Sequence, residues 1–331
     1  MKPVEKMSLG APANIASSPP MGELNVSNEL LGDPEALRVA WERDGYWFFR
    51  DVLDKDVIAE IRAKYMRYLA DYGAVDLADP QARCLGGDLD ALRKITNNSR
   101  LNREKTHRLL HEAPTINAFF RRLFGSEPFW IPFTVHRATP PAAERSGSRF
   151  EFIHADGIYN EGLDFLICWV PLAEIDAEIG GIAVVEGVHK QPTLHRKQNM
   201  KIIPIQEEDV PAAAWKRAVY RPGDVLLMSL DTPHSGIANH SDRFRLSMDT
   251  RVMPSSGRCP IVGEVTAVDA EGVSVRDGLG ERRFRFTAES FVRGTQGDQM
   301  PVADVPARYR AGDEVILAHE GELVVNMRPQ T

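Results

Sequence analysis

The chain has 331 residues, enough for one large domain or for a medium domain joined to a small one. Hydrophobic residues make up 43% and charged residues 26%, which is ordinary for a soluble globular protein. The net charge of −7 gives no broad electrostatic reason to bind nucleic acid or an acidic membrane surface, so neither partner is expected.

The first 25 residues hold small residues, prolines and scattered charges, without the continuous apolar core of a signal peptide. We expect residues 1–25 to form a mobile tail. Three cysteines, Cys84, Cys168 and Cys259, are far apart and odd in number, so they predict no disulfide framework. The most apolar run, residues 165–170, is too short to cross a bilayer. These features favour a reducing compartment and therefore a cytoplasmic location.

Residues 26–127 carry the signals of helices around a short strand. Asp33 can cap a first helix with a proline in its first turn, and this helix ends near Gly45. Asp54 opens a second helix, whose apolar residues recur at helical spacing. A third helical stretch ends at Gly125. We expect this part to be a helical support for the domain that follows.

Residues 128–254 consist of short β-prone runs broken by Gly, Pro and Asp, which predict a sandwich or barrel. A boundary is expected in the polar stretch 254–260. Beyond it, five short strands in about seventy residues fit a small β-barrel over residues 258–331. The alternative is that these strands extend the main sheet; we favour the separate barrel.

One strand-like stretch, FEFIHADGIYN at residues 150–160, places His154 and Asp156 two positions apart. On a strand both side chains project from the same face. An imidazole beside a carboxylate supplies two of the three ligands of a 2-His-1-carboxylate iron site. The ordinary alternative for an isolated His-x-Asp pair is a hydrogen-bonded surface pair, so a third ligand must decide.

His234 is the candidate for that third ligand, because it follows a predicted strand and lies at a turn. Three protein ligands on one face of an octahedron leave three positions open, which suits Fe(II) with O2 and a bidentate co-substrate. Arg245 and Ser247 share one face of the next strand. A guanidinium backed by a hydroxyl suits the distal carboxylate of a 2-oxo acid.

Four blocks occur in order between roughly residues 30 and 254: RDGYWFFRDVLDKDVIAEI, HADGIY, CWVPLAEIDAEIGGIAVVEGVHK and PHSGIANHSDRFRLSMDTRV. Together they resemble the phytanoyl-CoA dioxygenase-like family of Fe(II)/2-oxoglutarate-dependent oxygenases. The resemblance implies a mainly β fold, a double-stranded β-helix or jelly roll, with helices in its N-terminal part. It also implies His154, Asp156 and His234 as iron ligands and catalytic residues. Arg245 and Ser247 would bind 2-oxoglutarate.

Further co-substrate residues are implied by the same resemblance. Trp169 matches an aromatic residue that often lines the pocket, although an ordinary core tryptophan is the alternative. His136 and Arg137 fall on the strand before the triad, where one of the two is expected to face the pocket. Gly236 stands where many members carry a hydroxyl. Asp156 disfavours halogenation, because related halogenases have a small residue there.

The function implied is that of a dioxygenase that oxidises, by default hydroxylates, an unactivated C–H bond and releases succinate and CO2. Desaturation, ring closure or epimerisation need only a different fate of the substrate radical. The substrate is expected to be a small metabolite or natural-product intermediate, with ascorbate as an activator in vitro. Rival hypotheses are a jelly-roll oxygenase that does not use 2-oxoglutarate and a non-enzymatic sensor module. The C-terminal part is also a candidate surface for forming a homo-oligomer.

Overall fold

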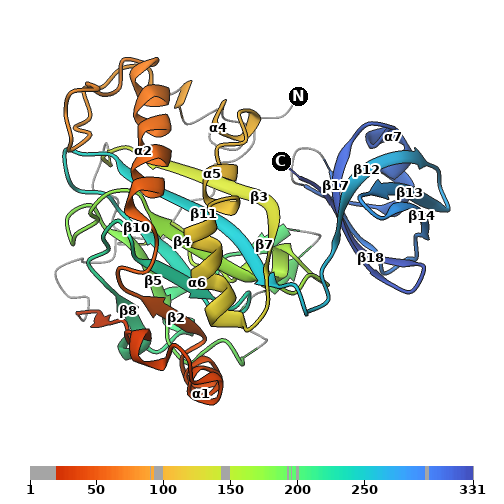
Figure 1. Cartoon of the computed structure of the whole chain (residues 1–331), viewed down its shortest axis with the longest axis horizontal. Coiled ribbons are helices and arrows are strands. Elements are labelled where there is room, and N and C mark those ends of the chain that lie inside the picture. Colours follow the sequence, from red (N-terminus) through yellow and green to blue (C-terminus); the bar gives the residue numbers. More distant parts are fainter. Residues whose placement is uncertain are drawn as a thin grey trace.

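The computed structural model describes residues 20–89, 91–92, 100–142, 150–191, 194, 196–198, 201–294 and 298–330. Residues 1–19 of the predicted tail lie outside this set. Figure 1 shows a larger part, in which helices cover one face of a sheet, and a group of C-terminal strands that lies to one side of it. A mainly β protein with helices in its N-terminal part is therefore confirmed.

The N-terminal helices begin and end where their caps predict. The Asp33 side chain accepts a hydrogen bond from the main chain of Ala36 at the start of α1 (Pro34–Asp44), and Gly45 ends that helix at a φ of 80°. Asp54 caps α2 (Lys55–Ala70) in the same way. Other helices that the structure describes here are η2 (Asn28–Leu30), α4 (Arg100–Arg103), α5 (Arg108–His111) and α6 (Pro114–Phe124).

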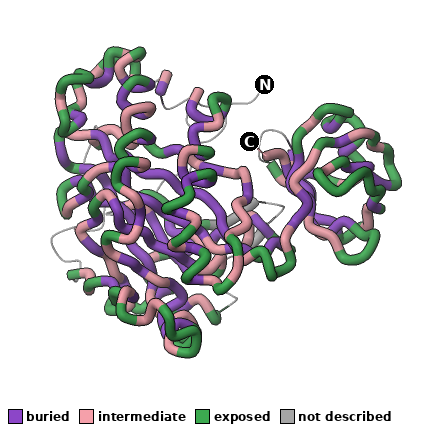
Figure 2. Tube along the Cα trace, in the orientation of Figure 1, coloured by how far each residue is buried: buried purple, intermediate pink, exposed green. Residues whose placement is uncertain are grey.

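A five-stranded sheet, which we call the central sheet, lies beneath these helices (Figure 1). Apolar side chains of α2 and α6 pack on its outer face and bury residues such as Leu227 and Met248. Figure 2 shows this sheet as largely buried, while the outer surfaces of the helices are exposed. Its strands, in spatial order, are β2 (Tyr46–Phe49), β9 (Val225–Met228), β4 (Leu166–Pro171), β11 (Arg245–Pro254) and β3 (Pro128–Thr139).

A four-stranded second sheet packs against the inner face of the central sheet. Ile182 and Val184 of the second sheet share one apolar cluster with Trp169 and Leu226 of the central sheet. Two sheets packed face to face are the arrangement expected of a jelly roll. The strands, in spatial order, are β1 (Gly22–Glu23), β8 (Trp215–Arg217), β5 (Gly181–Val185) and β10 (His234–Ile237). Because β1 pairs with β8, this sheet begins before the predicted boundary at residue 26.

Short elements complete the larger part of the chain. The 3-10 turn η3 follows the segment that carries His154, and two short strands form a separate hairpin. The bounds of these elements are η3 (Asp156–Tyr159), β6 (Arg196–Gln198), β7 (Lys201–Ile203), η4 (Glu207–Asp209) and η5 (Ala212–Ala214).

The C-terminal strands form a sheet of their own, here called the C-terminal sheet, and do not extend the central sheet among the described residues. It buries its own apolar cluster, which includes Val265, Val315 and Met327. A single residue pair, Arg285 with Leu323, joins β14 to β18, so a closed barrel remains a prediction. Its elements are β12 (Ile261–Val268), β13 (Gly272–Asp277), β14 (Gly280–Arg285), β15 (Phe291–Arg293), β16 (Gln299–Met300), η6 (Val302–Asp304), α7 (Val305–Arg308), β17 (Glu314–Glu320) and β18 (Leu323–Pro329).

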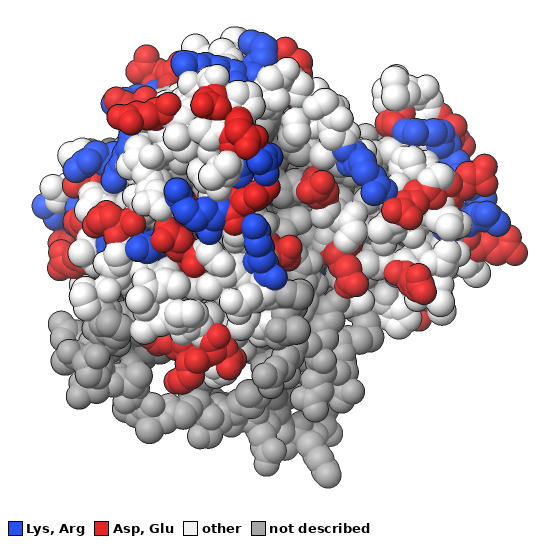
Figure 3. All heavy atoms as spheres, turned by 90° about the horizontal axis from the view of Figure 1, so that it is seen from below, with Lys and Arg blue, Asp and Glu red and all other residues white. Residues whose placement is uncertain are grey.

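Two observations concern the surface charge and the apolar character of the helices. On the face drawn in Figure 3, basic and acidic side chains are interspersed rather than gathered into areas of one sign. Among the described residues, no helix combines the length and apolar character needed to cross a bilayer.

Candidate active site

His154, Asp156 and His234 lie together, with one potential ligand atom of each within 4.8 Å of the others. The two histidines are cross-strand neighbours. Their main chains exchange hydrogen bonds, from His154 N to His234 O at 3.0 Å and from His234 N to His154 O at 2.8 Å. Their ring centroids are 4.4 Å apart. Pairing of the 150–154 segment with β10 thus brings together residues far apart in the sequence.

Asp156 reaches the group in a way that the strand prediction did not foresee. The chain is extended at Ala155 but then enters the 3-10 turn η3, of which Asp156 is the first residue. The Asp156 carboxylate lies 3.5 Å from His154 Nε2. The expectation that both residues project from one regular strand is therefore wrong, because a turn and not strand alternation places the carboxylate.

The ring nitrogens of both histidines are arranged for ligation through Nε2. His154 Nδ1 lies 3.1 Å from the carbonyl oxygen of Phe152, and His234 Nδ1 lies 3.0 Å from that of Thr232. A carbonyl oxygen accepts a hydrogen bond from a protonated Nδ1, and this tautomer leaves the Nε2 lone pair free. In each contact the carbonyl oxygen belongs to the residue two positions before the histidine, so the local backbone fixes the tautomer.

The protonation states also suit a cation. Burial, together with the neighbouring His154, lowers the pKa of His234 to about 4, so this imidazole is neutral at pH 7. Burial alone would favour the neutral acid at Asp156. Interaction with His154 and the positive charge of nearby Arg251 outweigh burial and lower the pKa of Asp156 below its ordinary value. A neutral imidazole and a carboxylate are the forms that bind metal ions.

A cavity of about 220 Å³ opens beside the two histidines. Its polar wall includes Arg245, Arg137 and Asp249, and its apolar wall includes Trp169 and Ile182. A cavity with apolar walls and a few convergent polar groups is the usual form of a small-molecule site. The two predicted histidine ligands and the predicted co-substrate arginine therefore face one space.

Arg245 is buried at the wall of this cavity, with 3% of its surface exposed. Its Nη1 donates to the carbonyl oxygens of Gly181 at 3.0 Å and Ile237 at 2.7 Å. Its Nη2 lies 3.3 Å from the carboxylate of Glu151. The backbone acceptors fix the guanidinium, so one edge of it faces the cavity in a defined direction.

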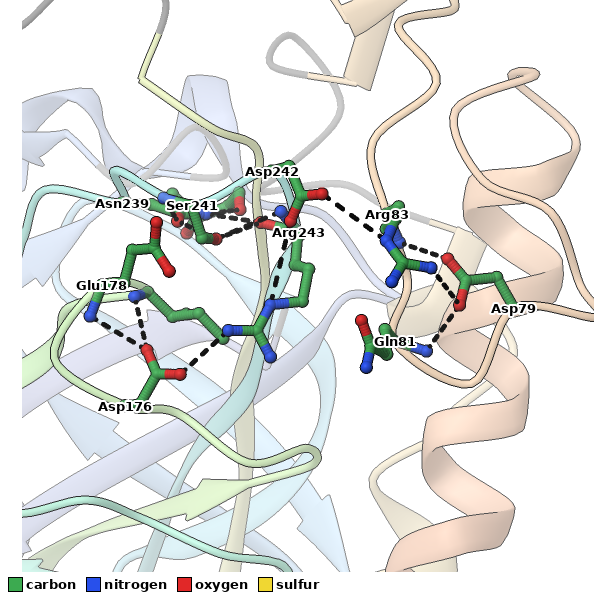
Figure 4. Close-up of polar contacts among 11 residues, drawn as sticks. Asp79, Gln81, Arg83, Asp176, Glu178, Asn239, Ser241, Asp242 and Arg243 are labelled. Carbon is green, nitrogen blue, oxygen red and sulfur yellow. Dashed lines mark hydrogen bonds and ion pairs between the residues drawn. The ribbon is translucent and has the colours of Figure 1, made fainter.

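The turn that connects β10 to β11, residues 238–244, is fixed by a polar network (Figure 4). Arg243 donates to Asp176 at 2.9 Å. Arg83, from the loop after α2, lies 3.5 Å from the carboxylate of Asp242. β10 begins at His234 and β11 begins at Arg245. By fixing the turn between these strands, the network helps to hold His234 and Arg245 in place relative to each other.

His136 and Arg137 lie on opposite faces of β3. Arg137 lines the cavity and is 3.6 Å from Asp249. His136 lies on the helix side, where its Nδ1 is 2.6 Å from the hydroxyl of Tyr65 on α2. The structure therefore does not bring His136 to the co-substrate pocket, because β3 pairs His136 with Met248, which packs beneath the helices.

The other two predicted co-substrate residues are placed differently. Trp169 lines the cavity, with its ring centroid 4.7 Å from that of Tyr220. Ser247 is fully buried, and its hydroxyl finds no partner among the described residues. It is not part of the cavity wall that the structure describes.

Sequence reasoning missed Asp249 and Arg251. Arg251 is buried, and its Nη2 lies 3.7 Å from the Asp156 carboxylate while its Nη1 lies 3.3 Å from that of Asp249. Burial raises the pKa of Asp249. The signal was available, since residues 245, 247, 249 and 251 alternate along β11 and so share a face.

Comparison with known proteins gives one family match and several relatives. The family described as Phytanoyl-CoA dioxygenase (PhyH) matches residues 41–247. A relative named 1-deoxypentalenic acid 11-beta-hydroxylase, from Streptomyces exfoliatus, is 28% identical over 69% of this chain and 83% of its own. Its counterpart from Streptomyces arenae is 26% identical over the same shares.

Among solved structures, the epimerase SnoN with Fe3+, alpha ketoglutarate and nogalamycin RO has a TM-score of 0.45 and 23% identity. That likeness covers 67% of this chain and 84% of the epimerase. EctD from S. alaskensis, solved with 2-oxoglutarate and 5-hydroxyectoine, also has a TM-score of 0.45, with 20% identity over 75% of this chain and 87% of its own.

Proposed function

Since the chain belongs to the phytanoyl-CoA dioxygenase family of 2-oxoglutarate-dependent non-haem iron oxygenases, we propose that it hydroxylates a small natural-product intermediate. The reaction would oxidise an unactivated C–H bond and release succinate and CO2. The observation that carries the proposal is the grouping of His154, Asp156 and His234 within 4.8 Å of one another, beside a cavity that Arg245 also lines. The hydroxylase names of the two curated relatives support hydroxylation as the outcome.

The donor set fits Fe(II). His154 and His234 would bind through Nε2, since their Nδ1 atoms lie against carbonyl oxygens, and Asp156 would bind through a carboxylate oxygen. Two imidazoles and one carboxylate form the facial set of non-haem iron oxygenases. When bound, Fe(II), 2-oxoglutarate and O2 supply the oxidising power needed to break an unactivated C–H bond.

Arg245 would hold the distal carboxylate of 2-oxoglutarate, with Ser247 behind it and Trp169 at the side. A buried guanidinium offers two parallel N–H donors, which match a carboxylate in geometry and charge. The chain would also orient the substrate against the apolar wall that Trp169 and Ile182 form. Arg137, at the same cavity, is positioned to contact either ligand.

The proposal includes the organisation of the chain. The oxygenase domain, predicted over residues 26–254, would begin at residue 22, because β1 belongs to the second of the two sheets that form its jelly roll. Residues 258–331 would be a small barrel. The facing sheets support the first assignment, and the separate C-terminal sheet with its own apolar cluster supports the second.

A succinate-release assay tests the function. Purified chain is incubated with Fe(II), ascorbate, 2-oxoglutarate and a panel of terpenoid and other natural-product acids that includes 1-deoxypentalenic acid. Substrate-dependent succinate together with a product that has gained one oxygen atom is the expected result. Loss of two hydrogen atoms would indicate desaturation or ring closure, and an unchanged mass would indicate epimerisation. Product without succinate would support an oxygenase that does not use 2-oxoglutarate.

A further inference from the structure

The C-terminal sheet contacts the loop that carries the predicted carboxylate ligand, residues 156–163, here called the carboxylate loop. Asn326 on β18 is fully buried, and its side-chain amide donates to the carbonyl oxygen of Glu161 at 2.6 Å. Arg293 on β15 donates to the carbonyl oxygen of Tyr159 at 3.2 Å. These bonds join residues far apart in the chain, so they exist only when the C-terminal sheet is docked.

A third contact leads directly to Asp156. Arg328 on β18 is buried and donates through Nη1 to the side-chain oxygen of Asn160. The amide nitrogen of the same Asn160 side chain donates to the main-chain oxygen of Asp156 at 2.8 Å. One asparagine therefore links a C-terminal arginine to the backbone of the predicted iron ligand.

A second route ends on the Asp156 carboxylate. The Arg328 guanidinium lies 3.6 Å from the ring centroid of Phe133, and the Arg251 guanidinium lies 4.4 Å from the same ring. Arg251 in turn lies 3.7 Å from the carboxylate of Asp156. Both guanidinium–ring distances are within the range of cation–π attraction. Arg328 is thus linked to the main chain of Asp156 through Asn160 and to its carboxylate through Phe133 and Arg251.

These polar contacts are costly in a way that apolar packing is not. Burial lowers the pKa of Arg328 well below its ordinary value, and the charges of Arg293 and Arg251 lower it further. The same junction also has an apolar part, where an added Cβ on Gly162 would lie 2.3 Å from Val325 Cγ1. Apolar contact alone can stabilise such a junction, and in some proteins buried charged groups are retained because they specify geometry.

We propose that the C-terminal sheet is a built-in positioning element for the carboxylate ligand of the iron site, with Arg328 and Asn160 as its positioning residues. The proposal rests on the proposed function, because it assumes that Asp156 binds iron. The matched family region ends at residue 247, so the C-terminal sheet lies wholly outside it.

The test uses the full chain and Co(II), which replaces Fe(II) without oxidation and reports its coordination through visible absorption. Arg328→Met and Asn160→Ala should each weaken Co(II) binding by about ten- to hundredfold, as changes around metal ligands do. Each should also alter the Co(II) spectrum. Arg328→Lys should restore part of the affinity, because an ammonium group can still donate to Asn160.

Arg258→Met is the matched control. Arg258 lies at the same junction, where it pairs with Glu320 at 3.0 Å. Both side chains of that pair are exposed, and among the described residues Arg258 makes no hydrogen bond or ion pair with the carboxylate loop. It should leave the affinity and the spectrum unchanged. The double variant Arg328→Met/Asn160→Ala should lose less affinity for Co(II) than the two single losses added together, since Arg328 and Asn160 share one hydrogen bond.

The outcomes separate the two proposals. If the unchanged chain binds no Co(II), the proposed function fails. If it binds Co(II) and both single variants bind within about twofold of it, with the same spectrum, the positioning role is overturned and the function stands. Should Arg328→Met fail to fold, the Asn160→Ala result decides alone.

Discussion

The Arg245 guanidinium and the Glu151 carboxylate lie 3.3 Å apart at the wall of the cavity beside His154 and His234. Gly236 makes this pair feasible, because a Cβ there would lie 2.2 Å from Glu151 Oε2. The residue proposed to bind the co-substrate carboxylate thus already faces a carboxylate of the chain. 2-Oxoglutarate has to compete with Glu151 for the same guanidinium.

Glu151→Gln should therefore tighten 2-oxoglutarate binding. The Glu151 side chain is 40% exposed, and such a partly screened pair contributes up to about 1 kcal/mol, which corresponds to an affinity gain of up to about fivefold. Anaerobic calorimetric titration of the metal-loaded chain with 2-oxoglutarate measures it. The exposed pair of Glu174 with Arg221 supplies the control, Glu174→Gln, which should change nothing. Weaker binding in Glu151→Gln would mean that Glu151 helps to hold the co-substrate.

Arg245→Ala should have the opposite effect. Losing a charge-assisted pair at a buried site typically costs about 2–5 kcal/mol, so the 2-oxoglutarate KM should rise by at least about thirtyfold. Metal binding should remain nearly intact, because Arg245 does not touch the triad. Arg245→Lys should recover only part of the affinity, since an ammonium cannot reproduce the planar fork. An unchanged KM in Arg245→Ala would assign the co-substrate carboxylate to another residue.

His234→Ala should abolish stoichiometric iron binding and turnover, because two remaining ligands cannot hold a facial site. Metal content after equilibration with limiting Fe(II) gives the measurement. The matched control is His111→Gln: His111 is also buried, but it lies beneath the helices and contacts Thr250 at 2.8 Å, away from the cavity. It should lower thermal stability while keeping the metal. A full complement of iron in His234→Ala would remove His234 from the site.

The sequence predicted those features of the fold and of the site that depend on residue type and on neighbours close in the chain. The caps at Asp33 and Asp54 mark helix starts because a side chain satisfies nearby N–H groups, which is a local effect. The sequence could not show which of His136 and Arg137 faces the cavity, because strand alternation places them on opposite faces without saying which face is inside. The pairing of β3 with β11 settles it.

The contact between the C-terminal sheet and the carboxylate loop could not be predicted from the sequence. Nothing in the local pattern around Arg328 or Asn326 indicates that β18 meets the carboxylate loop, since hydrogen bonds to Asn160 and Glu161 join segments more than 160 positions apart. The turn at Asp156 was missed for a related reason. A His-x-Asp spacing fits both a strand and the start of a 3-10 turn, and only tertiary contacts select between them.

The last prediction concerns a set of buried histidines outside the proposed site. Burial lowers the pKa of His107 to about 4 and of His136 to about 3, and it lowers that of His111 well below its ordinary value. In the unfolded chain each titrates near its ordinary value of about 6.5. Between about pH 6.5 and 4 the unfolded state therefore binds more protons than the folded state, and the free energy of unfolding falls as pH falls.

Urea unfolding at several pH values measures this dependence. Each histidine should contribute up to about 1.4 kcal/mol per pH unit within that window. His107→Gln is the most informative variant, because His107 Nδ1 has no hydrogen-bond partner among the described residues and its loss breaks little else. In this variant, the slope of the free energy of unfolding against pH should correspond to about one proton fewer taken up on unfolding than in the unchanged chain. His240→Gln, at an exposed histidine, should leave the slope as it is. An unchanged slope in His107→Gln would show that this histidine already binds a proton in the folded chain, because a group with equal proton occupancy in both states contributes no pH dependence.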